Sequence, residues 1–153
     1  MNQRFQALLT SAREKDVRLS FVLAGGGADL FGVFKIPGCS QSMMEARMLY
    51  SQESVRNFLA DPALQQFVCQ PVADQLARRM DELSEADICF AATSALSTQR
   101  ERRGQNRGFM AISCRQNIVL QKELIIRGSS REAQDASVAD DILTSVLNLL
   151  GKQ

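Results

Sequence analysis

An apolar run that ends in three consecutive glycines most limits the folds open to this chain. Residues 17–24 read V-R-L-S-F-V-L-A, which predicts a buried strand, and Gly25, Gly26 and Gly27 follow at once. Residues 28–35 then have the character of a short helix. A strand that passes through a glycine turn into a helix is typical of proteins built from layers of helices and strands.

The spacing of apolar residues elsewhere predicts further helices and strands in alternation. Helices are expected over four segments: 3–14, 52–59 with Ser51 as N-cap, 72–83, and a last one that begins after Ser129 or Ser130. Strands are expected over four more: 44–50, 87–94, 108–114 and 118–126. The last two strands form a hairpin, and the whole pattern predicts an α/β domain with a mixed sheet. A length of 153 residues fits one domain, 1–153.

The chain has no histidine, which removes several classes of chemistry. It cannot carry a Ser–His–Asp triad, a Cys–His dyad or a zinc ion held by imidazole. Its four cysteines, at 39, 69, 89 and 114, form no Cys-x-x-Cys motif, so we expect neither a metal nor a cofactor. The formal net charge is only +1, whereas proteins that bind nucleic acid usually carry a clear basic excess. We therefore expect no nucleic-acid partner.

No segment resembles a signal peptide or a membrane span. Residues 1–15 alternate polar and apolar side chains, and the longest apolar stretches are far shorter than the ~20 residues that a membrane helix needs. Scattered cysteines without a leader suit a reducing compartment. We therefore expect a cytoplasmic protein with no membrane partner.

The glycine turn is the first candidate binding site. Consecutive glycines before a helix let backbone N–H groups approach a phosphate or a carboxylate. The pattern is neither G-x-G-x-x-G nor a P-loop, because no Gly-Lys-Ser/Thr follows it. A tight turn with no ligand explains the glycines equally well, and Asp29 in the first helical turn would repel an anion.

A basic stretch, Arg100 to Arg107, is the second candidate. From Thr98 to Arg131 there are eight cationic and two anionic side chains, a local excess of six. Arginine clusters bind phosphates and carboxylates through paired donors, so we expect Arg103 or Arg107 to close over a bound phosphate. A solvated loop is the alternative, and it is the commoner outcome for a run of charges.

Two strand ends supply the remaining candidates. Tyr50, the only tyrosine, ends one predicted strand, and Thr93 and Ser94 end another. Ligand crevices in open α/β sheets form beside the carboxyl ends of strands, so these hydroxyls are placed to line one crevice. The alternative for Tyr50 is a buried ring with its hydroxyl in water.

These segments, in this order, resemble the C-terminal domain of the competence/damage-inducible protein CinA, a family that includes nicotinamide mononucleotide (NMN) deamidases. The most specific matches are I-P-G-C-S at 36–40 and M-L-Y-S at 48–51, and the resemblance spans residues 3–150. It implies a three-layer α/β/α sandwich, and it implies a site that includes Ser40, Tyr50 and Thr93. It also implies a homodimer or higher homo-oligomer, for which the strand around 43–48 offers apolar surface.

The positions that correspond to the family's catalytic residues differ in this chain. The family's first strand ends in Glu-Ser-Cys-Thr-Gly-Gly, and alignment on Gly26 and Gly27 places Leu23 at the nucleophilic serine. The family's lysine after the tyrosine falls on Val55. Amide hydrolysis through an acyl-enzyme needs a hydroxyl or thiol and a group to take its proton. Neither side chain supplies these groups, so we expect no catalytic residue at either position.

Three functions remain open on the sequence alone. The first is a catalytically degenerate domain that binds a pyridine nucleotide or related phosphate ligand without hydrolysing it. Its expected ligand-binding residues are Gly25, Gly26, Gly27, Ser40, Tyr50, Thr93, Arg103 and Arg107. The second is an active amidohydrolase whose nucleophile has moved to Ser40, Ser51, Thr93 or Cys39. The third is an oligomeric scaffold whose pocket is closed by Leu23; the departures from the family favour the first and third.

Overall fold

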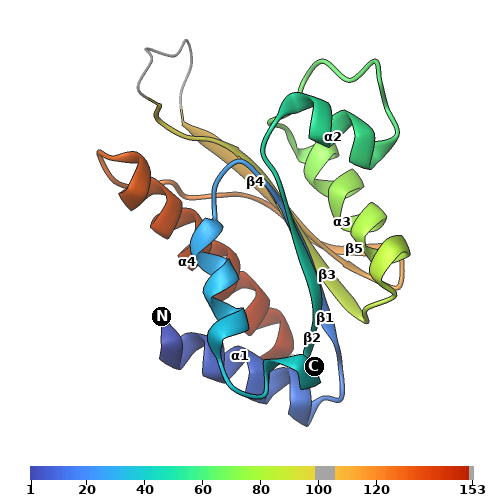
Figure 1. Cartoon of the computed structure of the whole chain (residues 1–153), viewed down its shortest axis with the longest axis vertical. Helices are drawn as coiled ribbons and strands as arrows, with labels where there is room; N and C mark the ends of the chain where they lie inside the picture. The colour runs from blue at the N-terminus through green and yellow to red at the C-terminus, as the bar shows by residue number, and fades with distance from the viewer. Residues whose placement is uncertain (99–105, 152–153) are drawn as a thin grey trace.

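Five strands form one mixed sheet in residues 1–98 and 106–151, the part of the chain that the computed structural model describes (Figure 1). Their order in the sheet is β2-β1-β3-β4-β5. Their bounds are β1 Leu19–Ala24, β2 Met43–Leu49, β3 Ile88–Ala95, β4 Arg107–Cys114 and β5 Asn117–Glu123. β1 runs parallel to β2 and β3, whereas β3, β4 and β5 pair antiparallel. The predicted mixed sheet with a late hairpin is confirmed.

Helices cover both faces of this sheet and make three layers (Figure 1). One face carries α1 (Asn2–Glu14), the 3-10 segment η1 (Ala28–Lys35) and α4 (Arg131–Gly151), and the other carries α2 (Gln52–Leu59) and α3 (Gln70–Ser84). A second short 3-10 segment, η2 (Cys39–Gln41), leads into β2. The three-layer α/β/α sandwich is confirmed. None of the described helices is long and apolar enough to span a membrane.

β1 lies inside the sheet, and all six of its residues are buried. Phe21 and Leu23 enter the core with α1 and α4, whereas Val22 and Ala24 enter the core with α2 and α3. A strand covered on both faces is apolar at nearly every position, and Ser20 is the one polar residue of β1. This is why the sequence identified β1 so clearly, although the strand begins at Leu19 rather than at residue 17.

β2 departs from its predicted alternation. In the sequence Met44, Ala46, Met48 and Tyr50 alternate with Glu45, Arg47 and Leu49, which predicts one half-buried face. In the structure the register shifts so that Leu19 pairs with Met43 and Ser20 pairs with Glu45. Met44 is therefore the extra residue of a bulge, and an extra residue reverses the alternation on one side of it. As a result Met43 is buried and Met44 is 37% exposed, whereas Ala46 and Met48 pack against the core as predicted. Tyr50 lies just past the end of β2 and is 73% exposed.

The glycine turn after β1 packs directly against the end of β3. A Cβ atom on Gly25 would lie 2.2 Å from the carbonyl oxygen of Ser94, and one on Gly26 would lie 2.5 Å from Leu96 Cδ1. Gly25 and Gly27 also have φ angles of +108° and +99°, which other residues rarely adopt. Close packing and backbone conformation therefore both require glycine in this turn, with or without a ligand.

A pair of glycine variants separates these two requirements. Gly38 has φ +84°, and a Cβ atom added there would meet no other atom within 4 Å. Gly38→Ala should therefore lower the free energy of unfolding by roughly 1–2 kcal/mol, the cost of placing alanine in a left-handed backbone conformation. Gly25→Ala adds an overlap with a backbone carbonyl, so it should lower the free energy of unfolding clearly further. Urea unfolding followed by circular dichroism measures both, and equal losses would contradict the close packing of the turn against β3.

Candidate functional site

A pocket lies at the carboxyl ends of β1, β2 and β3, where the strand ends predicted a crevice. Its volume is about 150 Å³. Its lining consists of Ala24, Gly25, Leu49, Tyr50, Ser51, Gln52, Val55, Phe67, Val68, Thr93 and Ser94. The structure therefore brings together three of the predicted site residues, Gly25, Tyr50 and Thr93, although they are far apart in sequence.

The lining of this pocket holds no acidic or basic side chain, and its hydroxyls are already bonded within the chain. Thr93 donates to the carbonyl oxygen of Phe67 at 2.7 Å, and Ser94 Oγ accepts the N–H of Gly26 at 2.8 Å. Ser51 caps α2 by accepting the N–H of Ser54 at 3.0 Å. A nucleophilic hydroxyl needs a neighbour that takes its proton, and this lining offers none.

The N–H groups of the glycine turn bind a carboxylate of the same chain. Asp135 on α4 accepts from Gly27 at 2.8 Å and from Ala28 at 3.0 Å through Oδ1, and from Asp29 at 3.2 Å through Oδ2. These are the donors at the start of η1 that the sequence suggested for a phosphate or carboxylate ligand. Such donors favour a negative charge, and α4 supplies one.

Arg131, one helical turn before Asp135, reaches the mouth of the pocket. Its guanidinium donates to the carbonyl oxygen of Ser97 and to the hydroxyl of Tyr50, both at 3.2 Å. Its central carbon lies 5.9 Å from the centroid of the Tyr50 ring, within cation–π range. α4 therefore brings a cation to the mouth of the pocket.

Sequence reasoning did not select Arg131 or Asp135 as site residues. A signal was available, because residues four apart share one face of a helix and both lie in the first turns of α4. The sequence could not show which residues this face of α4 would contact. The contacts with Tyr50 and with the glycine turn join segments 81 and 108 residues apart.

Other predicted site residues lie away from this pocket. Ser40 lies in η2, at the amino end of β2, whereas the pocket is at the carboxyl end of the same strand. Arg107 begins β4, where its guanidinium pairs with Glu123 at 2.7 Å and lies 5.0 Å from the Phe109 ring centroid. Arg103 lies outside the described residues. Ser40 and Arg107 therefore do not line the pocket.

The two positions that resemble the family's catalytic positions lie on opposite faces of the sheet. Leu23 is fully buried on the α4 side, and a Cβ atom on Gly27 would lie 3.1 Å from its Cδ1 atom. Val55 is 4% exposed and forms part of the pocket wall on the α2 side. Leu23 thus fills the space under the glycine turn, and the pocket beside Val55 stays open.

The cysteines offer no reactive thiol in this pocket. None of them lines it, and Cys39 lies in η2 beside Ser40. Burial raises the pKa of the Cys89 thiol to about 12, so it remains protonated at neutral pH. Among residues 1–98 and 106–151, no group of three or more His, Cys, Asp or Glu side chains is placed to hold a metal ion.

The mixed sheet between two helical layers, with a pocket at the strand ends, defines an α/β sandwich protein. Comparison with solved structures identifies the fold as that of the CinA superfamily. A CinA superfamily protein from Klebsiella pneumoniae 700603 has a TM-score of 0.84 and 17% identity, over 98% of this chain and 99% of that one. The competence damage-inducible protein A from Klebsiella pneumoniae subsp. pneumoniae scores 0.81 at 16% identity, over 98% and 94%.

A structure with a lower TM-score agrees. The competence/damage inducible protein CihA from Agrobacterium tumefaciens has a TM-score of 0.72 and 18% identity, over 98% of this chain and 91% of that one. No protein-family model matches the sequence, and no curated protein matches it significantly. The fold that the resemblance implied is therefore confirmed over nearly the whole chain.

Replacing Asp135 tests whether this carboxylate holds the turn. Asp135→Ala leaves three N–H groups without their acceptor, and charged hydrogen bonds of this kind contribute about 1.5–3 kcal/mol when they are well shielded. Because Asp135 is half-exposed, we expect a loss of about 1–2 kcal/mol in the free energy of unfolding. Glu132→Ala, an exposed acidic residue in the first turn of the same helix, is the control and should change it by less than ~0.5 kcal/mol. Equal effects in urea unfolding would mean that the turn does not depend on Asp135.

Proposed function

We propose that this chain is a CinA-like domain that binds a pyridine nucleotide or a related phosphate-bearing ligand without hydrolysing it. The observation that carries the proposal is the pocket at the strand ends, which is lined by neutral and apolar groups and has Arg131 at its mouth. An aromatic or amide head group suits this lining, and a negatively charged group suits the guanidinium.

The residues around the pocket support a function without hydrolysis. Leu23 and Val55 stand at the positions that resemble the family's serine and lysine, and neither carries a group that attacks a carbonyl or accepts a proton. Ser51 and Thr93, two proposed sites for a relocated nucleophile, line the pocket, but their hydroxyls are held by bonds to backbone or neighbouring groups. No acidic or basic side chain in the lining activates them.

The pocket's size indicates how such a ligand would lie. Sites for whole small molecules usually enclose roughly 300–1,000 Å³, twice or more the volume of about 150 Å³ found here. Only a ring-sized part of a nucleotide therefore enters, between walls that include Val55 and Phe67. Its phosphate stays outside, next to Arg131, whose planar guanidinium binds phosphate oxygens in pairs.

A scaffold that binds no small molecule is the second candidate function, and Asp135 favours it. The N–H groups of Gly27, Ala28 and Asp29 already have a charged acceptor, so this turn needs no phosphate for stability. The two candidates differ in one measurable property. A ligand that binds only the folded protein raises its melting temperature, whereas a scaffold shows no shift with any nucleotide.

We expect no release of ammonia from NMN above a buffer blank. The physical reason is the loss of both the nucleophile and the proton acceptor, which together usually account for several orders of magnitude in rate. The assay is run at high enzyme concentration, with an active NMN deamidase as positive control. A turnover on the order of 1 per second, within the usual range for enzymes, would show that the proposal is wrong.

Calorimetric titration of NMN tests binding and the role of Arg131. Arg131→Ala should weaken binding by roughly tenfold or more, since a hydrogen bond to a charged group contributes about 1.5–3 kcal/mol. Arg127→Ala removes an exposed positive charge just before α4 and is the matched control, with an affinity close to that of the unaltered protein. Equal weakening by both variants would indicate general charge attraction, and no binding to the unaltered protein would leave the scaffold function.

A further inference from the structure

Gln134, in the first turns of α4, is a polar side chain with only 2% of its surface exposed. Its amide oxygen accepts the N–H of Ser97 at 2.9 Å. Its amide nitrogen donates to Ser97 Oγ at 3.0 Å and to the carbonyl oxygen of Gly128 at 3.2 Å. Burying an amide is unfavourable unless its hydrogen bonds are made, and two of the three bonds made here go to one residue, Ser97.

Ser97 lies beyond the part of β3 that the sheet holds in place. The pairing between β3 and β4 ends where Ala95 faces Arg107, two residues before Ser97. Gln134 contacts both the backbone N–H and the side chain of Ser97, so the two bonds together fix where this residue lies. The end of β3 is thus held to α4 by a buried side chain rather than by a neighbouring strand.

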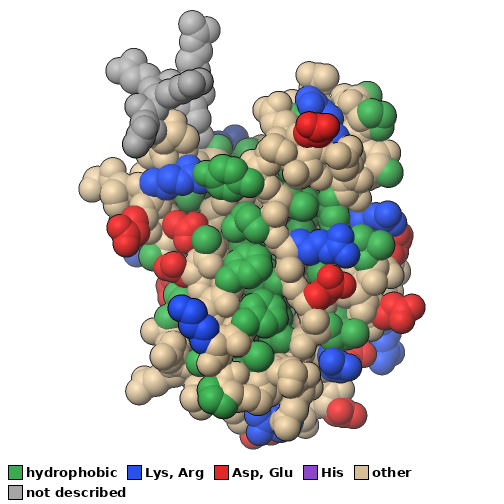
Figure 2. Space-filling model, in the orientation of Figure 1, with side chains coloured by type: hydrophobic (Ala, Val, Ile, Leu, Met, Phe, Trp, Pro, Cys, Tyr) green, Lys and Arg blue, Asp and Glu red, His purple; other side chains and the backbone are tan. Residues whose placement is uncertain are grey.

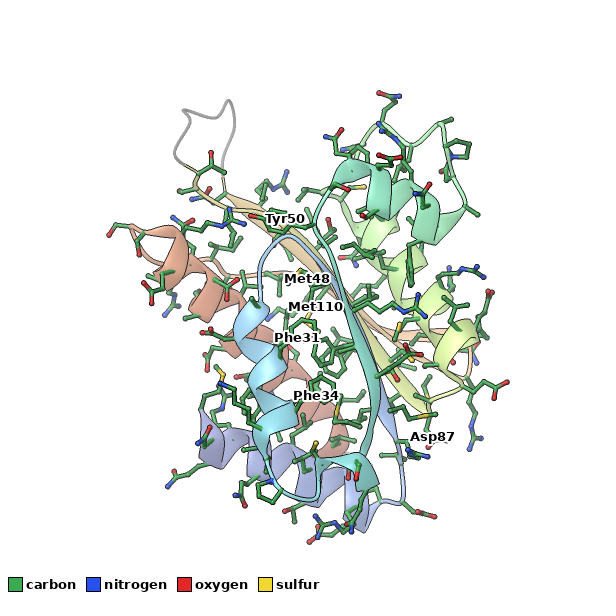
Figure 3. The ribbon with its side chains drawn as sticks, viewed as in Figure 1. Phe31, Phe34, Met48, Tyr50, Asp87 and Met110 are labelled. Atoms are coloured by element: carbon green, nitrogen blue, oxygen red, sulfur yellow. The ribbon has the colours of Figure 1, made fainter. Side chains whose placement is uncertain are left out.

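The carbonyl oxygen of Ser97 in turn anchors Arg131. One arm of the guanidinium donates to this oxygen and the other donates to the hydroxyl of Tyr50, both at 3.2 Å. Figure 2 shows a basic side chain lying against a hydrophobic one at this end of the molecule, as the cation–π contact of Arg131 with Tyr50 requires. Figure 3 shows Tyr50 at the upper end of β2, level with the first turns of α4. The guanidinium therefore spans from the end of β3 to the end of β2.

We propose that Gln134 is a positioning residue for phosphate recognition: by holding Ser97, it keeps the guanidinium of Arg131 at the mouth of the pocket. This inference rests on the proposed function, in which the phosphate of the ligand lies next to Arg131. Gln134 itself is buried and does not line the pocket, so it acts through Ser97 and Arg131 rather than by touching the ligand.

The physical reason is the conformational freedom of arginine. A long side chain that a ligand must first order lowers the affinity, whereas one already held in place does not. The bonds to Ser97 and Tyr50 use two of the five N–H donors of the guanidinium, and within the described part of the chain no other hydrogen bond occupies the rest. Arg131 is thus fixed and still able to bind phosphate oxygens.

A spectroscopic measurement without ligand tests the positioning step. Tyr50 is the only tyrosine, so protein labelled with carbon-13 at the tyrosine Cζ gives one NMR signal, and this signal reports on the contact with Arg131. Arg131→Ala defines its position when the contact is lost. Gln134→Met keeps an unbranched side chain of similar length without the amide, and it should move the signal most of the way to that position. In the Arg131→Ala background, Gln134→Met should cause no further change.

Ser137→Ala is the matched control. Ser137 also lies on α4, where its hydroxyl accepts the N–H of Arg127 at 2.9 Å and donates to the carbonyl oxygen of Ile125 at 3.0 Å. This variant therefore removes hydrogen bonds between α4 and the preceding segment without touching Ser97. It should leave the Tyr50 signal in place, and circular dichroism establishes that each variant is folded at the temperature of the measurement.

Calorimetric titration tests the consequence for binding with two probes, NMN and nicotinamide riboside, the same molecule without its phosphate. Gln134→Met should weaken NMN binding by roughly threefold to tenfold, because the ligand must then order Arg131 itself. It should leave the affinity for the riboside unchanged, since the riboside has no phosphate to meet the guanidinium. A purely structural role of Gln134 would instead weaken both probes equally.

Three results would overturn the proposal. One is a Tyr50 signal that Gln134→Met leaves where it is in the unaltered protein, since Arg131 would then keep its place without the amide. Another is a signal that Ser137→Ala moves as far as Gln134→Met does. The third is equal weakening of NMN and riboside binding by Gln134→Met. If NMN does not bind the unaltered protein, the proposed function is wrong, and the NMR comparison alone then supports or overturns the role of Gln134 in holding Arg131.

Discussion

The contact between Asp135 and the glycine turn is the interaction on which the rest of the candidate site depends. The turn packs so closely against β3 that only glycine fits, and the N–H group of the buried Gly27 then needs an acceptor within the protein. Asp135 provides it, and in doing so it sets where the first turns of α4 lie over the sheet. Arg131 lies on the same helical face, so the same contact carries a guanidinium to Tyr50.

The position that resembles the family's nucleophile shows how the core of this fold accommodates a leucine at the end of β1. β1 is covered on both faces and both edges, so a polar side chain at position 23 would have to find partners in an apolar core. Leu23 instead fills the space beneath Gly27, and full burial of a leucine contributes roughly 1.5–3 kcal/mol.

Elements with an unbroken or strictly periodic apolar pattern could be predicted from the sequence. β1 and β3 were recognised because both are buried on two faces, and the helical face of Val72, Leu76 and Met80 was recognised from its spacing. The bulge at Met44 was missed because it depends on the register with β1, which no local pattern encodes. The placement of Tyr50 and Thr93 at one pocket followed from the rule that parallel strands end at one edge of the sheet.

The sequence by itself determined the layered α/β architecture, the need for glycine after β1 and the lack of a nucleophile at position 23, because these depend on residue type and local periodicity. Only the tertiary structure decided which group meets the N–H donors of the turn and which cation stands at the pocket. Hydrogen bonds such as those from Gly27 to Asp135 and from Arg131 to Tyr50 join residues far apart in the chain. Their geometry arises only when α4 packs across the sheet, and no short-range pattern in the sequence records which side chain arrives there.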